Sequence, residues 1–356
     1  MKISMNICRR VVGLVVLAVF VVSAATSDEF ARWTNTVRRV EVRSSKDGTL
    51  QPSWFWAPPE AAERPVPLFV ATHTWSYDLN VLVHYWGPLD WCRENGWALL
   101  CPNFRGPNKT PQACGSDLAV QDVVDAVAWA KREVKIDADR IYMMGGSGGG
   151  HITLLLAGRH PEIWAGVVAW CANVDLALWH EQLTTKVTQF ARYAKMLEQV
   201  CGGTPAERMA EYRRRSPCAW LAHARERGVP VYIATGIHDG HPPRGGSVPV
   251  SQSLLAFNLL CRAEDRLSDA EIAYIDANEA VPDALAYAGP GDPFYADRNK
   301  IVFRRISGNV QQTLFEGGHD CNYPAGFEWL ARQRRGRPAD FSSPKSGSRV
   351  VEQLTY

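Results

Sequence analysis

The segment RIYMMGGSGGGHITLLLAG, residues 140–158, surrounds one serine with five glycines. The residues on either side predict a strand over 140–144 and a helix over 149–158, so Ser147 falls on the turn between them. A G-x-S-x-G turn between a strand and a helix is typical of a nucleophile elbow, which exposes the serine hydroxyl on a strained backbone. A phosphate-binding loop would end in Lys-Ser or Lys-Thr, and this segment does not. We therefore predict that Ser147 is a nucleophile and that the Gly148 amide donates to an oxyanion.

A serine nucleophile requires a general base, and the base requires a carboxylate that orients it. The buried strand predicted over 229–236 is followed by Asp239, and the strand predicted over 311–318 is followed by His319. Both residues would lie at the carboxyl ends of strands, where open α/β sheets place their sites. The order Ser147, Asp239, His319 is also the order found in α/β-hydrolases. We predict that Asp239 is the acid and that His319 is the base.

Two other carboxylates compete with Asp239. Asp175 follows the strand after the elbow and is the alternative acid. Asp320 adjoins His319, but as its chain neighbour it is expected to point away from the imidazole.

Three further histidines lie close to these motifs. His238 and His241 flank Asp239 in a pattern that would suit a metal, but we expect them to line the loop or to bond to the backbone. His151, one turn after the serine, is expected to pack beneath the elbow. We predict that the site uses no metal and no cofactor.

Apolar strands alternate with helical patterns along most of the chain. Apart from the elements that flank Ser147, a hairpin is predicted over 37–59, and strands over 66–74, 97–104, 164–172, 229–236 and 311–318. Helices are predicted over 81–95, apart from its Gly-Pro break, over 118–134, with Asp117 as a possible cap, and over 250–261 and 325–335. Strands that are apolar throughout and alternate with helices are typical of a parallel sheet covered on both faces. The sequence therefore predicts an α/β fold with a mostly parallel, doubly wound sheet.

Two stretches depart from this alternation. Residues 175–220 read as mainly helical, and residues 262–300 contain several prolines. Because both lie between core strands, we expect them to be insertions over the site of a single domain that covers residues 26–340. Residues 341–356 are expected to form a loose tail.

The first 25 residues resemble a secretory signal. Three basic residues precede the apolar run VVGLVVLAVFVV, and small residues follow it. A membrane span needs about 20 apolar residues, which is more than this run provides. We predict a signal peptide over 1–25, export to the periplasm or the medium, and no stable membrane insertion after cleavage.

Charge and cysteine content describe the rest of the chain. Without Lys2, Arg9 and Arg10, 36 Lys and Arg residues balance 37 Asp and Glu residues, so a nucleic-acid partner is not expected. An even number of cysteines in an exported chain suggests disulfides, and we expect one to three. The eight cysteines that follow the signal are Cys92, Cys101, Cys114, Cys171, Cys201, Cys218, Cys261 and Cys321.

Six segments together resemble a known family. PNFRG (102–106), DVVDAVAWA (122–130), DADRIYMMGGSGGGH (137–151), YRRRSP (212–217), VPVYIATGIHD (229–239) and FEGGHD (315–320) follow the order of the prolyl oligopeptidase catalytic domain. The resemblance implies an α/β-hydrolase fold and acyl hydrolysis without a cofactor. It also implies the same three roles for Ser147, Asp239 and His319.

The chain departs from that family in two places. Its peptidases usually carry an N-terminal β-propeller, whereas here about 40 residues lie between the predicted signal and the first core strand, too few to build one. Many relatives read His-Gly-Gly where this chain reads His73-Thr74-Trp75. The second oxyanion donor is therefore predicted to be the Trp75 or Thr74 amide, with the Tyr77 side chain as an alternative.

The substrate is the least determined part of the prediction, because esters and peptides share this machinery. Trp75, Tyr77 and Trp179 supply aromatic surface that suits a sugar or a phenolic group, and we expect Tyr77 and Trp179 to line the pocket. The predicted substrate is a small or oligomeric acyl compound, with a carboxylic ester such as an acylated carbohydrate preferred over a short peptide. An inactive hydrolase fold that serves as a binding protein is the alternative from another class.

Export makes a direct prediction for the mature N-terminus. Protein recovered outside the producing cell is expected to begin near Ala25 or Thr26, because the small residues there suit signal cleavage. N-terminal sequencing measures this, and an intact Met1 on the external protein would contradict processing.

Overall fold

Nine strands and ten helices make up the main elements of a computed structural model that describes residues 33–83, 87–295 and 299–342. The strands are β1 (Arg38–Arg43), β2 (Leu50–Trp56), β3 (Val66–Thr72), β4 (Ala98–Pro102), β5 (Ile136–Gly146), β6 (Gly166–Trp170), β7 (Val231–Gly236), β8 (Ile301–Ser307) and β9 (Val310–Phe315). The helices are α2 (Pro88–Asn95), α3 (Asp117–Glu133), α4 (Gly148–Arg159), α5 (Leu176–Thr185), α6 (Arg192–Cys201), α7 (Pro205–Arg215), α8 (Leu221–Glu226), α9 (Val250–Leu260), α10 (Asp269–Asn278) and α11 (Tyr323–Arg332). The predicted signal peptide and nearly all of the predicted tail lie outside the described residues.

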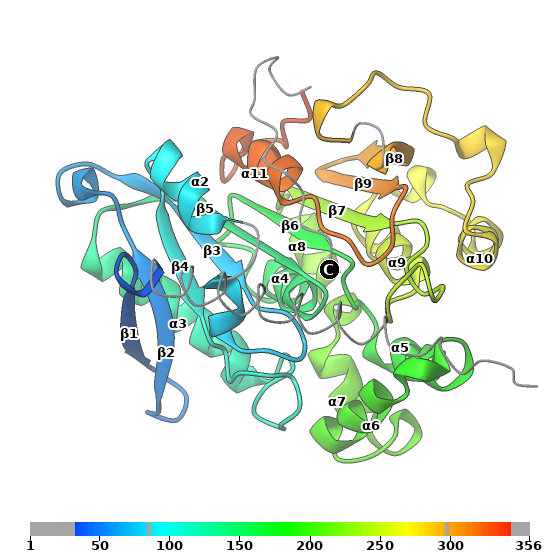
Figure 1. Ribbon diagram of the computed structural model, residues 1–356, viewed down its shortest axis with the longest axis horizontal. Coiled ribbons are helices and arrows are strands. Elements are labelled where there is room, and N and C mark those ends of the chain that lie inside the picture. Colours follow the sequence, from blue (N-terminus) through cyan, green and yellow to red (C-terminus); the bar gives the residue numbers. More distant parts are fainter. Residues whose placement is uncertain (1–32, 84–86, 296–298, 343–356) are drawn as a thin grey trace, which may run out of the picture.

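All nine strands join one sheet in the order β1-β2-β4-β3-β5-β6-β7-β9-β8 (Figure 1). The six strands from β4 to β9 in this order are parallel to one another. The edges are antiparallel, with β1 and β2 at one side and β8 at the other. This arrangement confirms the predicted mostly parallel α/β sheet.

Helices cover both faces of the sheet, as Figure 1 shows. Along β3, Leu68 and Val70 pack into one apolar cluster with α3, α4, α8 and α9. Phe69 and Ala71 point the other way and pack with α2 and α11. Because successive side chains of a strand face opposite sides, a strand covered on both faces must be apolar throughout. Every residue of β3 is buried for this reason.

The two predicted insertions have different contents. Residues 175–220 form α5, α6 and α7, which pack around an apolar cluster of their own that also includes Trp75. The second stretch contains α10 and several short helical turns before β8. An additional apolar cluster joins α10 to α9 and to the last two strands.

Three local details differ from or refine the sequence predictions. The helix α2 begins at Pro88, directly after the predicted Gly-Pro break, where Gly87 has a left-handed backbone (φ 54°). Ser116, and not Asp117, caps α3 by accepting a hydrogen bond from the Ala119 amide. Strand β8 was not predicted, since its sequence IVFRRIS has no clear apolar alternation.

The expected disulfides are not present among the described residues. All eight cysteines from Cys92 to Cys321 are free thiols, and seven of them are buried. They behave as small apolar side chains, a common use of cysteine in protein cores.

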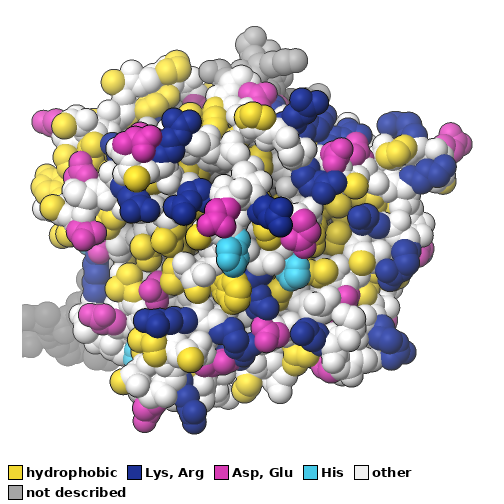
Figure 2. Space-filling view, turned by 180° about the vertical axis from the view of Figure 1, so that it is seen from behind, with side chains coloured by type: hydrophobic (Ala, Val, Ile, Leu, Met, Phe, Trp, Pro, Cys, Tyr) yellow, Lys and Arg dark blue, Asp and Glu magenta, His cyan; other side chains and the backbone are white. Residues whose placement is uncertain are grey.

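Among the described residues, no helix has both the length and the apolar character required to cross a membrane. Figure 2 shows acidic and basic side chains interspersed over the face in view. This mixture agrees with the nearly balanced charge of the sequence.

Candidate active site

Ser147 lies on a strained turn between β5 and α4. Its backbone has φ 56° and ψ −120°, a conformation that a residue with a side chain rarely adopts. The Ser147 amide donates to Trp170 O at 2.8 Å, which fixes the turn to the end of β6. Ser147 is partly exposed, whereas the residues on either side of it are buried. The predicted nucleophile elbow is therefore present in the backbone.

The glycines around Ser147 are explained by close approach of other segments. A Cβ atom added to Gly148 would lie 2.5 Å from Trp75 N and 2.6 Å from Trp75 Cα. A Cβ atom added to Gly146 would lie 2.5 Å from Cys321 Sγ. Distances below 3.0 Å are not tolerated by carbon atoms, so the elbow has room only for glycine at these two positions.

Asp239 and His319 are brought together as the sequence predicts. His319 Nδ1 lies 2.7 Å from Asp239 Oδ2. The Gly240 and Gly246 amides each donate to Asp239 Oδ1 at 3.0 Å. The Asp239 side chain is fully buried and that of His319 is 24% exposed. The carboxylate is thus fixed by backbone donors while the ring still reaches the surface.

The environment of His319 controls its protonation. Burial is the largest influence and opposes the charged form, but the attraction of the Asp239 carboxylate outweighs it and raises the pKa of His319 to about 9. A buried carboxylate stabilises the imidazolium in this way wherever an Asp–His pair accepts a proton.

Ser147 lies near this pair without a hydrogen bond to it among the described residues. Within the described chain, no hydrogen bond joins Ser147 Oγ to His319. The two are connected through β6, since Ser147 N bonds to Trp170 O and the next residue, Cys171, lies beside Asp239 and His319. Bonds of this kind are often long without substrate and tighten when substrate binds.

The two amides predicted as oxyanion donors lie next to each other. Gly148 is the first residue of α4, where amides have no partner within the helix. The Trp75 amide lies directly against Gly148, because a Cβ atom added to Gly148 would lie only 2.5 Å from Trp75 N. Neither amide donates a hydrogen bond to another described residue. Both are therefore available to an oxyanion. The contact of the Trp75 backbone with Gly148 favours Trp75 over Thr74 as the second donor.

A buried histidine supports the chain before Trp75. His73 Nδ1 lies 3.0 Å from Thr74 O, and Nε2 lies 2.7 Å from Asn103 O. The ring stacks on Phe104 with a centroid distance of 3.8 Å. Sequence reasoning did not identify this support, although His73 directly follows a buried strand.

The predicted pocket residues have opposite exposures. Tyr77 is 55% exposed and is available to a ligand, whereas Trp179 is only 1% exposed. Trp179 packs edge-on against Trp75 and donates from Nε1 to Ser247 O. The prediction that Trp179 lines the pocket is therefore wrong: it supports the wall from behind. The partly buried Tyr193, stacked on Trp179, lies closer to the surface and was not predicted.

The alternative carboxylates have structural roles. Asp175 caps α5 and accepts hydrogen bonds from the Ala177 and Leu178 amides. Asp320 accepts from the Gly318 amide at 2.7 Å, within its own loop. Of the three carboxylates, Asp239 is the one hydrogen-bonded to the His319 ring in the described part of the chain.

His238 and His241 face the second insertion. His238 Nδ1 lies 2.8 Å from Glu279 Oε2, and His241 Nε2 lies 2.6 Å from Asp276 O. These contacts attach the loop of Asp239 to the end of α10. His241 contacts the backbone, as expected, whereas His238 lies between the carboxylates of Glu279 and Glu316.

His151 is buried beneath the elbow, as expected. Its Nε2 lies 2.8 Å from Arg215 O, and burial lowers its pKa to about 4. Arg215 is itself buried and donates to Ala113 O, Cys114 O and Pro111 O. The elbow is thus supported by the last residue of α7.

One residue near the pair was missed entirely. Cys171 directly follows β6, and its Sγ lies within 4.8 Å of a carboxylate oxygen of Asp239 and an imidazole nitrogen of His319. Thr235 Oγ1 donates to Cys171 Sγ at 3.4 Å. Burial raises the pKa of Cys171 well above its ordinary value, so the thiol is neutral. Its position directly after a core strand, like that of the predicted site residues, was the available signal.

The parallel sheet with a strained serine turn after β5 defines an α/β-hydrolase fold. A model of the prolyl oligopeptidase family matches residues 89–273, a little more than half of the chain. The chain belongs to the prolyl oligopeptidase family.

Two curated proteins and one solved structure are similar to parts of this chain. Dipeptidyl aminopeptidase BIII of Pseudoxanthomonas mexicana is 28% identical over 56% of this chain and 29% of its own length. The acylamino-acid-releasing enzyme of Rattus norvegicus is 32% identical over 36% of this chain and 18% of its own length. Both matches span less than a third of the relative. The solved structure of Pyrococcus horikoshii acylaminoacyl peptidase covers 86% of this chain and 43% of its own at 13% identity, with a TM-score of 0.54, which supports the fold.

The packing of the elbow predicts a large effect of one methyl group. Gly148→Ala is expected to lower the free energy of unfolding by about 1–3 kcal/mol, because the new Cβ overlaps the Trp75 backbone. Gly291→Ala is the matched control, since a Cβ there meets no atom within 4 Å. Urea unfolding measures both, and equal stability of the two variants would contradict the close packing.

Proposed function

We propose that this protein is an exported serine hydrolase in which Ser147, Asp239 and His319 form the catalytic triad. The observation that carries the proposal is the buried Asp239 carboxylate bonded to His319 Nδ1, beside a strained serine turn with two available amides. Export rests on residues 1–25 alone.

In the proposed mechanism, His319 takes the proton of Ser147 Oγ as the oxygen attacks an acyl carbon. Asp239 holds the ring and stabilises the imidazolium that forms. The Gly148 and Trp75 amides stabilise the tetrahedral oxyanion. Collapse of this intermediate expels the leaving group, which takes the proton from His319. Water then hydrolyses the acyl-enzyme with His319 again acting as the base.

The relatives support a peptide as the acyl substrate. The two curated proteins reported above are named as a dipeptidyl aminopeptidase and an acylamino-acid-releasing enzyme. They outweigh the preference for esters that the aromatic residues suggested. We therefore propose a short peptide, cleaved near its N-terminus, as the principal substrate class.

A carboxylic ester with an aromatic or sugar component is the second candidate. Trp75, Trp179 and Tyr193 form a continuous aromatic group beside the elbow, and Tyr193 reaches the surface. Aromatic rings of this kind stack on flat or apolar groups of substrates. Ester cleavage would use the same triad.

A substrate panel with one variant tests the proposal. The purified chain is assayed on a dipeptidyl anilide, an N-acetylated amino-acid anilide, p-nitrophenyl acetate, a feruloyl ester and acetylated xylan. Ser147→Ala is expected to reduce turnover of the best substrate by about 10⁴–10⁶-fold, while Ser76→Ala, an exposed serine nearby, leaves turnover within about twofold.

The outcomes of this panel separate the candidates. Faster cleavage of either anilide supports the peptidase proposal, and faster cleavage of every ester supports the second candidate. Absence of turnover together with no labelling of Ser147 by a fluorophosphonate would favour a binding protein instead.

The raised pKa of His319 predicts an alkaline enzyme. The base must be neutral, and its pKa is about 9, so kcat/KM is expected to rise about tenfold for each pH unit up to about 9 and then to level off. Activity is therefore lost as the pH falls through 9. The measurement is kcat/KM between pH 6 and pH 10.

Two variants identify the group responsible. Asp239→Asn removes the carboxylate that raises the pKa of His319. The rise of kcat/KM is therefore expected at lower pH, and its maximum value is expected to be reduced about 10⁴-fold. Asp175→Asn changes only the cap of α5 and is expected to leave the pH dependence of kcat/KM unchanged. A rise centred between pH 6 and 7 in the unmodified chain would refute the assignment.

A further inference from the structure

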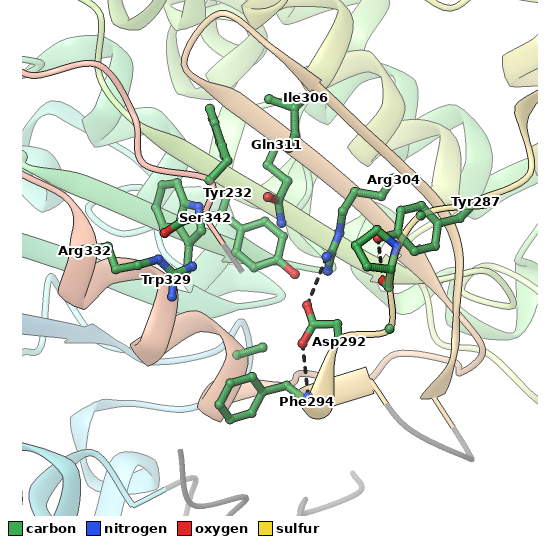
Figure 3. A pocket seen from close by; sticks show the side chains of 15 residues that line it. Tyr232, Tyr287, Asp292, Phe294, Arg304, Ile306, Gln311, Trp329, Arg332 and Ser342 are labelled. Carbon is green, nitrogen blue, oxygen red and sulfur yellow. Dashed lines mark hydrogen bonds and ion pairs between the residues drawn. The ribbon is translucent and has the colours of Figure 1, made fainter. Parts of the chain in front are cut away.

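A cavity of about 270 Å³ lies between α11, the strands β7, β8 and β9, and the segment that precedes β8 (Figure 3). Tyr232 and Gln311 line it near the beginnings of β7 and β9. Asp239 and His319 follow the opposite ends of these two strands. The cavity is therefore separate from the candidate active site.

Aromatic side chains form much of the cavity wall. Trp329 extends into it from α11, and Tyr232 rises from the sheet (Figure 3). Tyr287, Phe294 and Phe341 complete the aromatic lining. The volume is just below the range of about 300–1,000 Å³ that is usual for small-molecule sites. It suits a ligand with one aromatic ring and a short substituent.

Arg304 is held by the protein through its Nε and Nη1 atoms. Its Nη1 pairs with Asp292 Oδ2 at 3.0 Å, and its Nε donates to Thr313 Oγ1 at 3.1 Å. The guanidinium also lies over the rings of Tyr287 and Tyr295. Its charge is neutralised within the fold, so Arg304 has a structural role in the wall.

Arg332 is different, because one edge of its guanidinium has no partner. Nη1 donates to Glu328 O at 3.0 Å and lies 3.8 Å from Glu328 Oε2. Nε is buried without a hydrogen-bond partner, and Nη2 donates to no acceptor among the described residues. Burial lowers the pKa of Arg332, although the carboxylates of Glu328, Asp340 and Asp292 act in the opposite direction.

The unpartnered edge indicates the chemistry of a ligand. The Nε and Nη2 hydrogens of a guanidinium are parallel and match the two oxygens of a carboxylate. A buried N–H group without a partner is costly, so an acceptor at this position would be favourable. Figure 3 shows Arg332 and Trp329 on one side of the cavity, opposite Asp292 and Arg304.

We propose that this cavity binds a small aromatic carboxylate, whose carboxylate pairs with the Nε and Nη2 edge of Arg332 and whose ring packs against Trp329 and Tyr232. An inorganic anion would use the guanidinium but not the aromatic wall. A neutral aromatic compound would leave the buried Nε unpaired. The aromatic carboxylate is the class that satisfies both features.

Calorimetric titration of the full chain with phenylacetate and with phenylacetamide tests the proposal. The two probes have the same shape and differ in charge. Phenylacetate is expected to bind once per chain with a Kd of about 0.1–1 mM, and phenylacetamide at least about tenfold more weakly. The titration uses Ser147→Ala protein, so that the result does not depend on whether the triad is active.

Variants of Arg332 locate the binding. Arg332→Gln is expected to weaken phenylacetate at least about tenfold and to abolish the preference over the amide. Arg332→Lys, which keeps the charge but loses the paired edge, should also lose most of the affinity. Arg337 is an exposed arginine shortly after α11, and the Arg337→Gln variant should bind phenylacetate as tightly as the unmodified chain does. Melting temperatures verify that each variant is folded.

Three results would overturn the proposal. They are equal binding of phenylacetate and phenylacetamide, unchanged binding by both Arg332 variants, and displacement of phenylacetate by equimolar inorganic phosphate. The last result would indicate a site for simple anions.

Discussion

The candidate site depends on a close contact between two backbones, that of Gly148 at the start of α4 and that of Trp75 after β3. The contact has no room for a Cβ atom, so it requires glycine at that position. It places two amides side by side next to Ser147, whose backbone conformation costs about 1–3 kcal/mol. The surrounding fold must supply that energy, and it does so through the Ser147–Trp170 bond and the buried His151 beneath the turn.

The first insertion is part of this support and not only a cover. Arg215, the last residue of α7, bonds to three carbonyl groups of the loop that precedes α3, while its own carbonyl contacts His151 under the elbow. A buried guanidinium is tolerated only where such acceptors surround it. The insertion, the loop and the elbow are therefore one packed unit, and Trp179 contributes to the same unit by supporting Trp75.

Sequence reasoning succeeded where chemistry and chain order constrain each other. The glycines around Ser147, and the carboxylate and imidazole that follow buried strands, have few alternative explanations in an alternating α/β pattern. It failed where the answer depends on packing between distant segments. The burial of Trp179 is set by α6 and by Ser247. Cys171 is placed by the end of β6, and all eight cysteines are free thiols, seven of them buried. Strand β8 was missed because an edge strand needs no apolar alternation on its outer side.

The antiparallel edge strands of the sheet affect the tendency of this protein to aggregate at high concentration. Exposed edge strands invite pairing with strands of other molecules, which leads to aggregation. Here β1 exposes Arg38, Arg39 and Arg43 at one edge, and β8 carries Arg305 at the other. Two such edges would place like charges opposite each other, and such pairs are destabilising. The outer strands thus protect the apolar parallel strands between them from intermolecular sheet extension.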